Sequence, residues 1–176
     1  MTGVSLPLAD ENLREKASRI RLAVFDVDGV LTDGRFSLDH EGREIKTFHT
    51  QDGFGLRQLI EHDIHVAIIT GRQSGAVSKR MAELGIEHVF QGIREKRATI
   101  DTLIGQLGLT QHQVAAVGDD LPDLAMFSAA GLKIAVDNAV QALKDQCDLV
   151  TSRSGGLGAV REISDFLLQA QANRTQ

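Results

Sequence analysis

The chain has 176 residues, of which 42% are hydrophobic and 24% charged, and its formal net charge is −5. This length predicts one domain with a substantial core. The acidic balance gives no basic field for nucleic acid, but it is compatible with a phosphorylated substrate, because local cations and a metal can bind an anion on an acidic protein. Cys147 is the single cysteine, which excludes an intramolecular disulfide and a cysteine zinc cluster.

The first 21 residues carry several charged side chains and no apolar stretch of signal-peptide length. No run of apolar residues is long enough to span a bilayer. We therefore expect a cytoplasmic protein.

Apolar patterns along the chain predict strands and helices that alternate. An amphipathic helix is expected over residues 8–19, followed by a buried strand over Leu22–Phe25. Further strands are expected at 65–69, 88–90, 114–117, 133–136 and 149–150, with helices at 52–61, 76–83, 97–107, 121–129, 140–144 and 160–169. Such alternation predicts an α/β fold of three layers, a Rossmann-like parallel sheet between helices with right-handed crossovers.

One interval interrupts this alternation. Residues 34–49 contain two short arms, with Phe36 and Leu38 in one and Ile45 in the other, separated by the turn sequence DHEG. This pattern predicts a β-hairpin. Because the hairpin directly follows an acidic motif, we expect it to lie beside the active site.

That motif reads DVDGVLTDG and begins where the first strand ends. Asp and Gly are ordinary turn residues, so a structural turn is the simplest interpretation. However, ligands of parallel sheets bind at the carboxyl ends of the strands, and alternate residues point the same way. Asp26 and Asp28 can therefore face one reacting group, as a nucleophile, a proton donor and metal ligands for phosphoryl transfer.

Three further segments follow predicted strands or begin helices. Thr70, in ITGRQ, can bind a phosphate oxygen, although threonine is also a common helix N-cap. Lys96 lies in the first turn of a helix, where a cation opposes the helix dipole, so it suggests an anionic partner unless it is simply solvated. The sequence GDDLPD places Asp119, Asp120 and Asp123 together. Their mutual repulsion favours a cation, and oxygen ligands with few histidines suit Mg²⁺.

In this order, the four segments resemble the motifs of the haloacid dehalogenase (HAD) superfamily of phosphatases. The resemblance implies that Asp26 is the nucleophile that forms an aspartyl-phosphate. It implies that Asp28 protonates the leaving oxygen and later activates water, and that Thr70 and Lys96 bind the transferred phosphoryl group. Asp26, the main-chain carbonyl of Asp28 and Asp119 would hold Mg²⁺.

The spacing of the motifs leaves no room for a cap domain, since the first gap holds only the hairpin and Thr70 and Lys96 are 26 residues apart. The fuller pattern VDGVLTDG, TQDGFG, ITGRQS, VGDDLPD and SGGLGAVRE resembles the 3-deoxy-D-manno-octulosonate 8-phosphate phosphatases, which serve lipopolysaccharide biosynthesis. That family implies a homotetramer in which the hairpin and tail (152–176) of neighbouring subunits complete the pocket. The positions matching its substrate contacts are Asp28, His49, Thr50, Gln51, Asp52, Gly53, Arg72, Arg80 and Lys96.

One position departs from the resemblance, because Leu157 stands where the family has a basic residue. Gly155–Gly158 can also be explained as a flexible lead into the last helix. Two alternatives remain beside this family. They are a phosphatase for sialic-acid-type 9-phosphates and a phosphatase-like subunit paired with a nucleotidyl transferase. An inactive homologue is disfavoured, because the expected catalytic and metal-binding residues are all present, namely Asp26, Asp28, Thr70, Lys96 and Asp119. A receiver-like phospho-acceptor module is a further alternative, but receivers place the phosphorylated aspartate in the middle of the chain.

Overall fold

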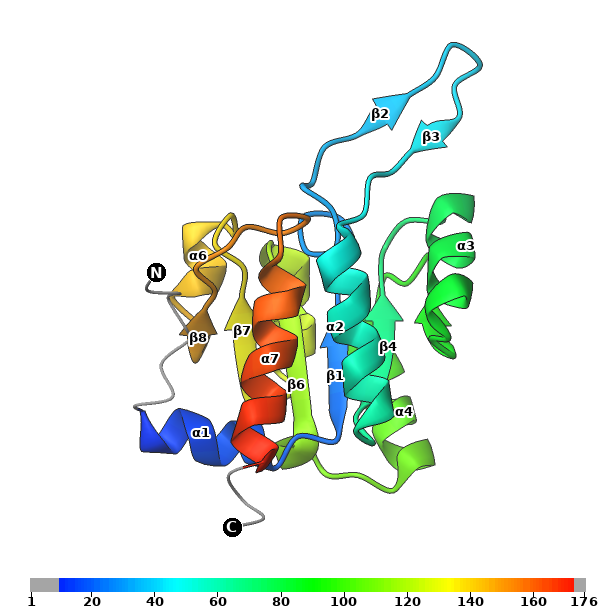
Figure 1. Cartoon of the computed structure of the whole chain (residues 1–176). Helices are drawn as coiled ribbons and strands as arrows, with labels where there is room; N and C mark the ends of the chain where they lie inside the picture. The colour runs from blue at the N-terminus through cyan, green and yellow to red at the C-terminus, as the bar shows by residue number, and fades with distance from the viewer. Residues whose placement is uncertain (1–9, 173–176) are drawn as a thin grey trace.

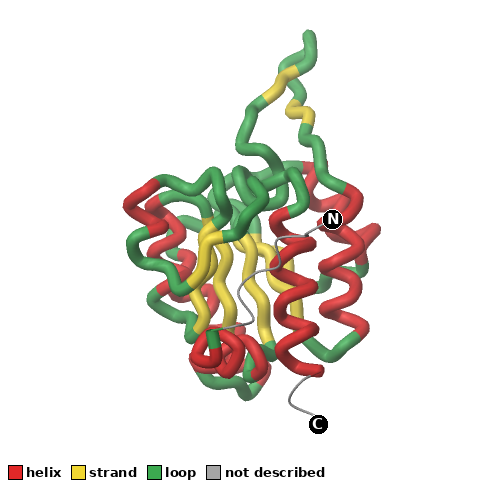
Figure 2. The backbone as a smooth tube through the Cα atoms, turned by 60° about the vertical axis from the view of Figure 1, so that its left-hand side comes forward, coloured by secondary structure: helices red, strands yellow, loops and turns green. Residues whose placement is uncertain are grey.

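A computed structural model describes residues 10–172, which form a six-stranded parallel sheet with helices on both faces (Figure 1 and Figure 2). The strand order is β5-β4-β1-β6-β7-β8. These strands are β1 (Leu22–Phe25), β4 (His65–Ile69), β5 (His88–Phe90), β6 (Val114–Gly118), β7 (Leu132–Ala135) and β8 (Leu149–Val150). The α/β fold predicted from the alternation is confirmed.

Strand β1 lies at the centre of the sheet, and all four of its residues are buried. Phe25 is opposite Ile68 of β4 on one side and opposite Val117 of β6 on the other. A strand with parallel neighbours and helices on both faces must be apolar throughout, which explains the continuous run. The register brings the carboxyl ends of β1, β4 and β6 to one edge of the sheet.

The helices form a layer on each face of the sheet (Figure 1). On one face, α2 packs against both α7 and α3, and α7 packs against α1, whereas α4 packs against α5 on the other. The bounds are α1 (Glu11–Ser18), α2 (Thr50–Glu61), α3 (Gly75–Leu84), α4 (Lys96–Leu107), α5 (Leu124–Phe127), α6 (Gln141–Lys144) and α7 (Ala159–Ala172). No helix within residues 10–172 is both long and apolar enough to cross a membrane.

Element boundaries differ from the predictions where polar groups cap a helix. Helix α1 begins at Glu11, because the Asp10 carboxylate accepts the backbone N–H groups of the first turn. Residues 8 and 9 of the predicted helix lie outside the described residues. The helix predicted over 121–129 is a short 3-10 turn, η2 (Leu121–Asp123), followed by α5. A second 3-10 turn, η1 (Gln111–Gln113), precedes β6.

The predicted hairpin is present as β2 (Ser37–Leu38) and β3 (Glu44–Ile45), which pair antiparallel. The Asp39 carboxylate accepts the backbone N–H groups of Glu41 and Arg43 and so closes the turn. Figure 1 shows the hairpin rising above the sheet edge at which the carboxyl ends of the strands meet. It therefore stands over the region where the motifs converge.

Candidate active site

Two of the predicted catalytic side chains meet at this edge in a buried ion-pair cluster. Lys96, the first residue of α4, donates from Nζ to Oδ1 of Asp26 and to Oδ1 of Asp123, each at 2.7 Å. Its side chain is 7% exposed, so Lys96 is not the solvated lysine of the simpler interpretation. Burial alone would lower the pKa of Lys96, but the two carboxylates outweigh burial and raise it. The cluster therefore holds a charged ammonium beside Asp26.

Asp119, which follows β6, extends this cluster on its acidic side. Oxygens of Asp26, Asp119 and Asp123 lie within 4.8 Å of one another. Burial raises the pKa of Asp119 to about 7, and repulsion from Asp123 and Asp26 acts in the same direction. Burial also raises the pKa of Asp26, against the effect of Lys96. A divalent cation would relieve this repulsion, and three carboxylates fit a hard cation such as Mg²⁺.

Asp120 lies outside this acidic cluster, and Asp123 makes structural contacts in addition to its place within it. Oδ2 of Asp123 accepts the backbone N–H groups of Asp119 and Asp120, at 2.9 and 3.2 Å. Asp123 therefore holds both the loop after β6 and the ammonium of Lys96 in place. The exposed carboxylate of Asp120 accepts the N–H of Leu121 and caps η2.

The loop after β1 is folded tightly on itself. The carbonyl of Val27 accepts the backbone N–H groups of residues 30–32. Gly29 has φ +90°, and a Cβ there would overlap the Asp119 carboxylate. Glycine is therefore required both for the backbone conformation and for the close approach of β6. This contact brings the first and last acidic motifs together.

Asp28 lies on the open side of this loop, with its side chain 29% exposed. Its Oδ1 accepts a hydrogen bond from Nζ of Lys46, a residue of the hairpin. Its Oδ2 lies 4.0 Å from Nε of Arg72. Lys46 was not predicted, because it belongs to no motif and lies in a segment identified only by its alternating pattern.

Thr70 lies immediately after β4 and is 3% exposed. The parallel register of β1 and β4 places it beside the beginning of the first-motif loop. Its Oγ1 accepts the backbone N–H of Arg72 at 3.4 Å. The predicted contact of Thr70 with a phosphoryl group stays a prediction.

Several of the predicted substrate-contacting residues gather at the start of α2. His49 caps this helix, since its Nδ1 accepts the N–H of Gln51 at 3.3 Å. Arg80 of α3 lies against Gly53, where any side chain would overlap its guanidinium group. His49, Gly53 and Arg80 line a small common hollow, and Thr50 and Gln51 are exposed nearby.

Asp52 has a different position from the one expected of a substrate ligand. It is 1% exposed, and its carboxylate accepts the backbone N–H groups of Gly158 and Arg161, at 3.3 and 2.8 Å. These are orphan donors at the start of α7. The side chain of Asp52 is therefore engaged in capping α7, and its predicted contact with substrate stays a prediction.

Asp52→Ala should lower the free energy of unfolding by about 1–3 kcal/mol, because one buried and one partly buried N–H group at the start of α7 lose their acceptor. Urea denaturation monitored by circular dichroism measures this change. Asp52→Asn, which keeps one acceptor oxygen, should lose less. Equal stability of Asp52→Ala and the unsubstituted protein would contradict the capping role.

The glycine-rich segment before α7 is packed tightly against the first motif. A Cβ on Gly155 would overlap the backbone of Gly29, and a Cβ on Gly156 would overlap that of Thr32. Asn138 joins the two segments, since its Nδ2 donates to the Gly29 carbonyl at 2.9 Å and its Oδ1 accepts the Gly155 N–H. The segment is therefore a support of the active-site loop and not merely a flexible lead.

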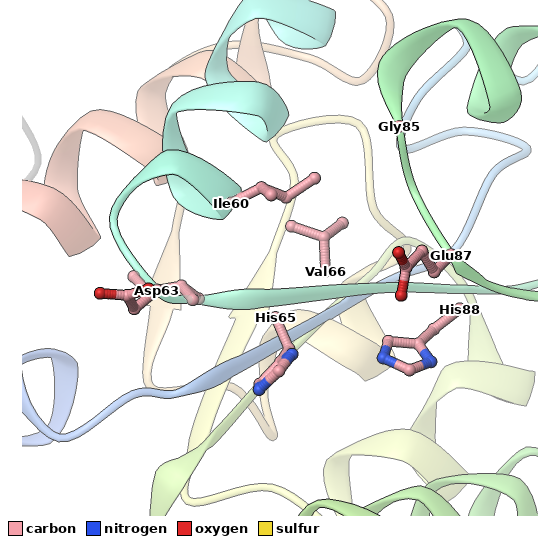
Figure 3. A pocket seen from close by; sticks show the side chains of 8 residues that line it. Ile60, Asp63, His65, Val66, Gly85, Glu87 and His88 are labelled. Atoms are coloured by element: carbon pink, nitrogen blue, oxygen red, sulfur yellow. The ribbon is translucent and has the colours of Figure 1, made fainter.

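A separate hollow of about 250 Å³ lies at the amino ends of β4 and β5 (Figure 3). Its lining includes Ile60, Val66, His65 and His88, and the two imidazole rings pack edge to face with centroids 6.0 Å apart. This hollow is at the opposite edge of the sheet from Asp26. It is therefore separate from the acidic cluster.

The raised pKa of Asp119 predicts a pH effect on the stability of the metal-free protein. The folded-state pKa is about 7, against an ordinary value of 3.8. Between these values the folded chain keeps a proton that the unfolded chain has released, so rising pH favours unfolding. Thermal unfolding of chelated protein from pH 5 to pH 7 should show a falling midpoint. Asp119→Asn should show a smaller fall, and an identical fall in both proteins would contradict the assignment.

Comparison with known proteins agrees with this geometry. Residues 89–162 match the model of the haloacid dehalogenase-like hydrolase family. The 3-deoxy-D-manno-octulosonate 8-phosphate phosphatase of Haemophilus influenzae is 44% identical over 159 residues, covering 90% of this chain and 88% of that protein. The chain belongs to this phosphatase family.

Other members of the 3-deoxy-D-manno-octulosonate 8-phosphate phosphatase family support the assignment. The Escherichia coli K12 enzyme is 46% identical over 156 residues, covering 89% of this chain and 83% of that enzyme. The solved structure of the Moraxella catarrhalis enzyme, in complex with magnesium, phosphate and KDO, is 42% identical with a TM-score of 0.90. The match covers 93% of this chain and 94% of that one. The predicted family and the HAD-like fold without a cap domain are thus confirmed.

Proposed function

We propose that this chain, as one phosphatase domain over residues 1–176, hydrolyses 3-deoxy-D-manno-octulosonate 8-phosphate to 3-deoxy-D-manno-octulosonate and phosphate. This activity would serve lipopolysaccharide biosynthesis in the cytoplasm. The observation that carries the proposal is the cluster in which Lys96 joins Asp26 to Asp123 beside Asp119. Membership of the phosphatase family supports the choice of substrate.

In the proposed reaction, a carboxylate oxygen of Asp26 attacks phosphorus as the bond to the sugar oxygen breaks. Asp28 donates a proton to that leaving oxygen. Water then attacks the aspartyl-phosphate, Asp28 takes a proton from it, and Asp26 is regenerated as phosphate leaves. Thr70 and Lys96 bind the phosphoryl oxygens, on which the transition state spreads its charge.

Asp26, the main-chain carbonyl of Asp28 and Asp119 would hold Mg²⁺. When bound, the ion neutralises the repulsion between a carboxylate nucleophile and an anionic phosphate. The raised pKa of Asp119 supports this assignment, because a buried carboxylate in an acidic cluster is costly without a cation.

The sugar acid would occupy the side of the site formed by the start of α2 and the loop after β4. We assign its contacts to Arg72, Arg80 and residues 49–51, with the backbone at Gly53. An arginine can bind the substrate carboxylate through two parallel hydrogen bonds. The position of Arg80 against Gly53 supports a role near His49.

Phosphate release from the purified protein tests the substrate. The arms are 3-deoxy-D-manno-octulosonate 8-phosphate, a sialic-acid-type 9-phosphate and a simple sugar phosphate, each with Mg²⁺. We expect the first to have the highest kcat/KM. A higher value for the 9-phosphate would select the alternative phosphatase, and no hydrolysis of any substrate would reject the proposed function.

We also propose that the protein is a homotetramer assembled through its hairpins. Phe36, Leu38 and Ile45 are each more than half exposed. A two-stranded hairpin is marginally stable alone, so these side chains are expected to pack against another subunit. The predicted tail was also expected to reach a neighbouring subunit. Residues 159–172 of this tail form α7, which packs against α1 and α2 of its own subunit, and residues 173–176 lie outside the described residues.

Light scattering at micromolar concentration tests this assembly. We expect a tetrameric mass for the unsubstituted protein and a smaller mass for Ile45→Lys. Lys79→Ala, on the exposed surface of α3, serves as a control and should remain tetrameric. A monomeric mass with full activity would overturn the proposal.

A further inference from the structure

The hairpin is attached to the active site through charged side chains. Whereas Phe36, Leu38 and Ile45 are more than half exposed, the side chain of Lys46 is 2% exposed. A lysine ammonium is almost never buried unless it is paired. The burial of Lys46 therefore depends on the groups that surround it.

These groups form a closed ring of alternating charge. Nζ of Lys46 donates to Oδ1 of Asp28 and lies 3.4 Å from Oε1 of Glu44. Nη2 of Arg72 lies 3.1 Å from Oε2 of Glu44, and its Nε lies 4.0 Å from Oδ2 of Asp28. The guanidinium group also stacks over the Phe36 ring, 4.2 Å from its centroid. Two carboxylates and two cations thus join the first-motif loop, the hairpin and the loop after β4.

Asp28 depends on this ring for its orientation. Among residues 10–172, Lys46 and Arg72 are the cations within ion-pair distance of its carboxylate. The carboxylate is otherwise part-exposed, so without these cations it would be free to rotate toward solvent. Lys46 makes the closer contact, and its ammonium occupies Oδ1. Oδ2, which lies 4.0 Å from Nε of Arg72, is then the oxygen that would carry the proton exchanged with substrate.

We propose that Lys46 is a positioning residue for Asp28. The Lys46 ammonium holds the acid–base carboxylate in place, so the position of that carboxylate depends on the contact between the hairpin and the first-motif loop. The inference rests on the proposed function, because it concerns the proton transfer assigned to Asp28. It differs from a role in substrate binding, which would act through contacts with the sugar. It differs also from a purely structural role, which would not depend on Asp28.

A double-mutant cycle tests the proposal. The unsubstituted protein, Lys46→Met, Asp28→Asn and the double variant are compared in phosphate release from 3-deoxy-D-manno-octulosonate 8-phosphate at saturating Mg²⁺. Lys46→Met should lower kcat by up to about 10²-fold, the cost of a misplaced catalytic group. Asp28→Asn should lower kcat by about 10²- to 10⁴-fold. The double variant should be no slower than Asp28→Asn, since Lys46 acts through Asp28.

Two further variants sharpen the result. Lys46→Arg keeps the charge and should recover part of the lost kcat, with KM nearly unchanged in both Lys46 variants. Arg43→Met is the matched control, because Arg43 is an exposed cation of the same hairpin that pairs with Asp39 and Glu41. It should retain the kcat of the unsubstituted protein.

The proposal is overturned if the Lys46→Met effect is undiminished in the Asp28→Asn background, or if Lys46→Met raises KM and leaves kcat unchanged. Circular dichroism first establishes that each variant is folded. If Lys46→Met is not, Lys46→Gln is taken through the same cycle. If the unsubstituted protein releases no phosphate, the proposed function itself fails, and this outcome is distinct from loss of coupling in an active protein.

Discussion

Replacement of Asp26 by Asn should abolish turnover, with a loss on the order of 10⁶-fold, as is typical when a nucleophile is removed. An amide oxygen cannot form the acyl-phosphate on which the proposed reaction depends. Steady-state phosphate release measures the loss. Mass spectrometry of rapidly quenched enzyme should detect a phosphate adduct in the unsubstituted protein and none in the variant.

Asp101→Asn is the control for this substitution. Asp101 is an exposed carboxylate of α4 that pairs with Arg97, so its loss should leave turnover unchanged. Because Asp26 also pairs with buried Lys96, thermal unfolding must show that the Asp26 variant is folded. Undiminished turnover by folded Asp26→Asn would reject the nucleophile assignment.

Removal of divalent cations should likewise abolish activity, and addition of Mg²⁺ should restore it. The clustered carboxylates of Asp26, Asp119 and Asp123 are the reason, since a cation relieves their repulsion. Asp119→Ala removes a proposed ligand. Loss of a residue that only supports a metal ligand typically weakens metal binding by about 10- to 100-fold. Asp119→Ala should therefore raise the Mg²⁺ concentration needed for half activity by at least this factor.

Asp120→Ala is a matched control, because this neighbouring carboxylate is exposed and caps η2. Its requirement for Mg²⁺ should be nearly that of the unsubstituted protein. Calorimetric titration with Mg²⁺ gives a second readout that is independent of turnover. Full activity of the chelated enzyme, or an equal shift for both variants, would contradict the metal assignment.

The sequence predicted the parts of the site that lie at strand ends. Asp26, Thr70 and Asp119 follow β1, β4 and β6, and the parallel register carries all three to one edge. Lys96 was expected to have an anionic partner, and its ammonium pairs with Asp26 and Asp123. Its contact with a phosphoryl group stays a prediction. Asp26, Thr70 and Asp119 were identifiable because periodicity fixes where a strand ends, and Lys96 because it lies at the start of a predicted helix.

The parts that could not be predicted depend on how separate segments pack. Lys46 reaches Asp28 only because the hairpin folds over the first motif, and alternation within the hairpin does not specify that docking. Asp52 matched a family position by sequence, but its carboxylate is turned toward the start of α7. The glycines at 155 and 156 suggested flexibility, whereas they allow two backbones to touch.

The contact between Gly155 and Gly29 joins positions that are 126 residues apart. During synthesis the segment that bears Asp26 and Asp28 therefore precedes the partner that supports its loop by more than a hundred residues. Non-local contacts of this kind form late and slow folding. The growing polypeptide therefore carries its reactive carboxylates without a complete site. The support of the first-motif loop is thus supplied by a segment that is synthesised well after the carboxylates it positions.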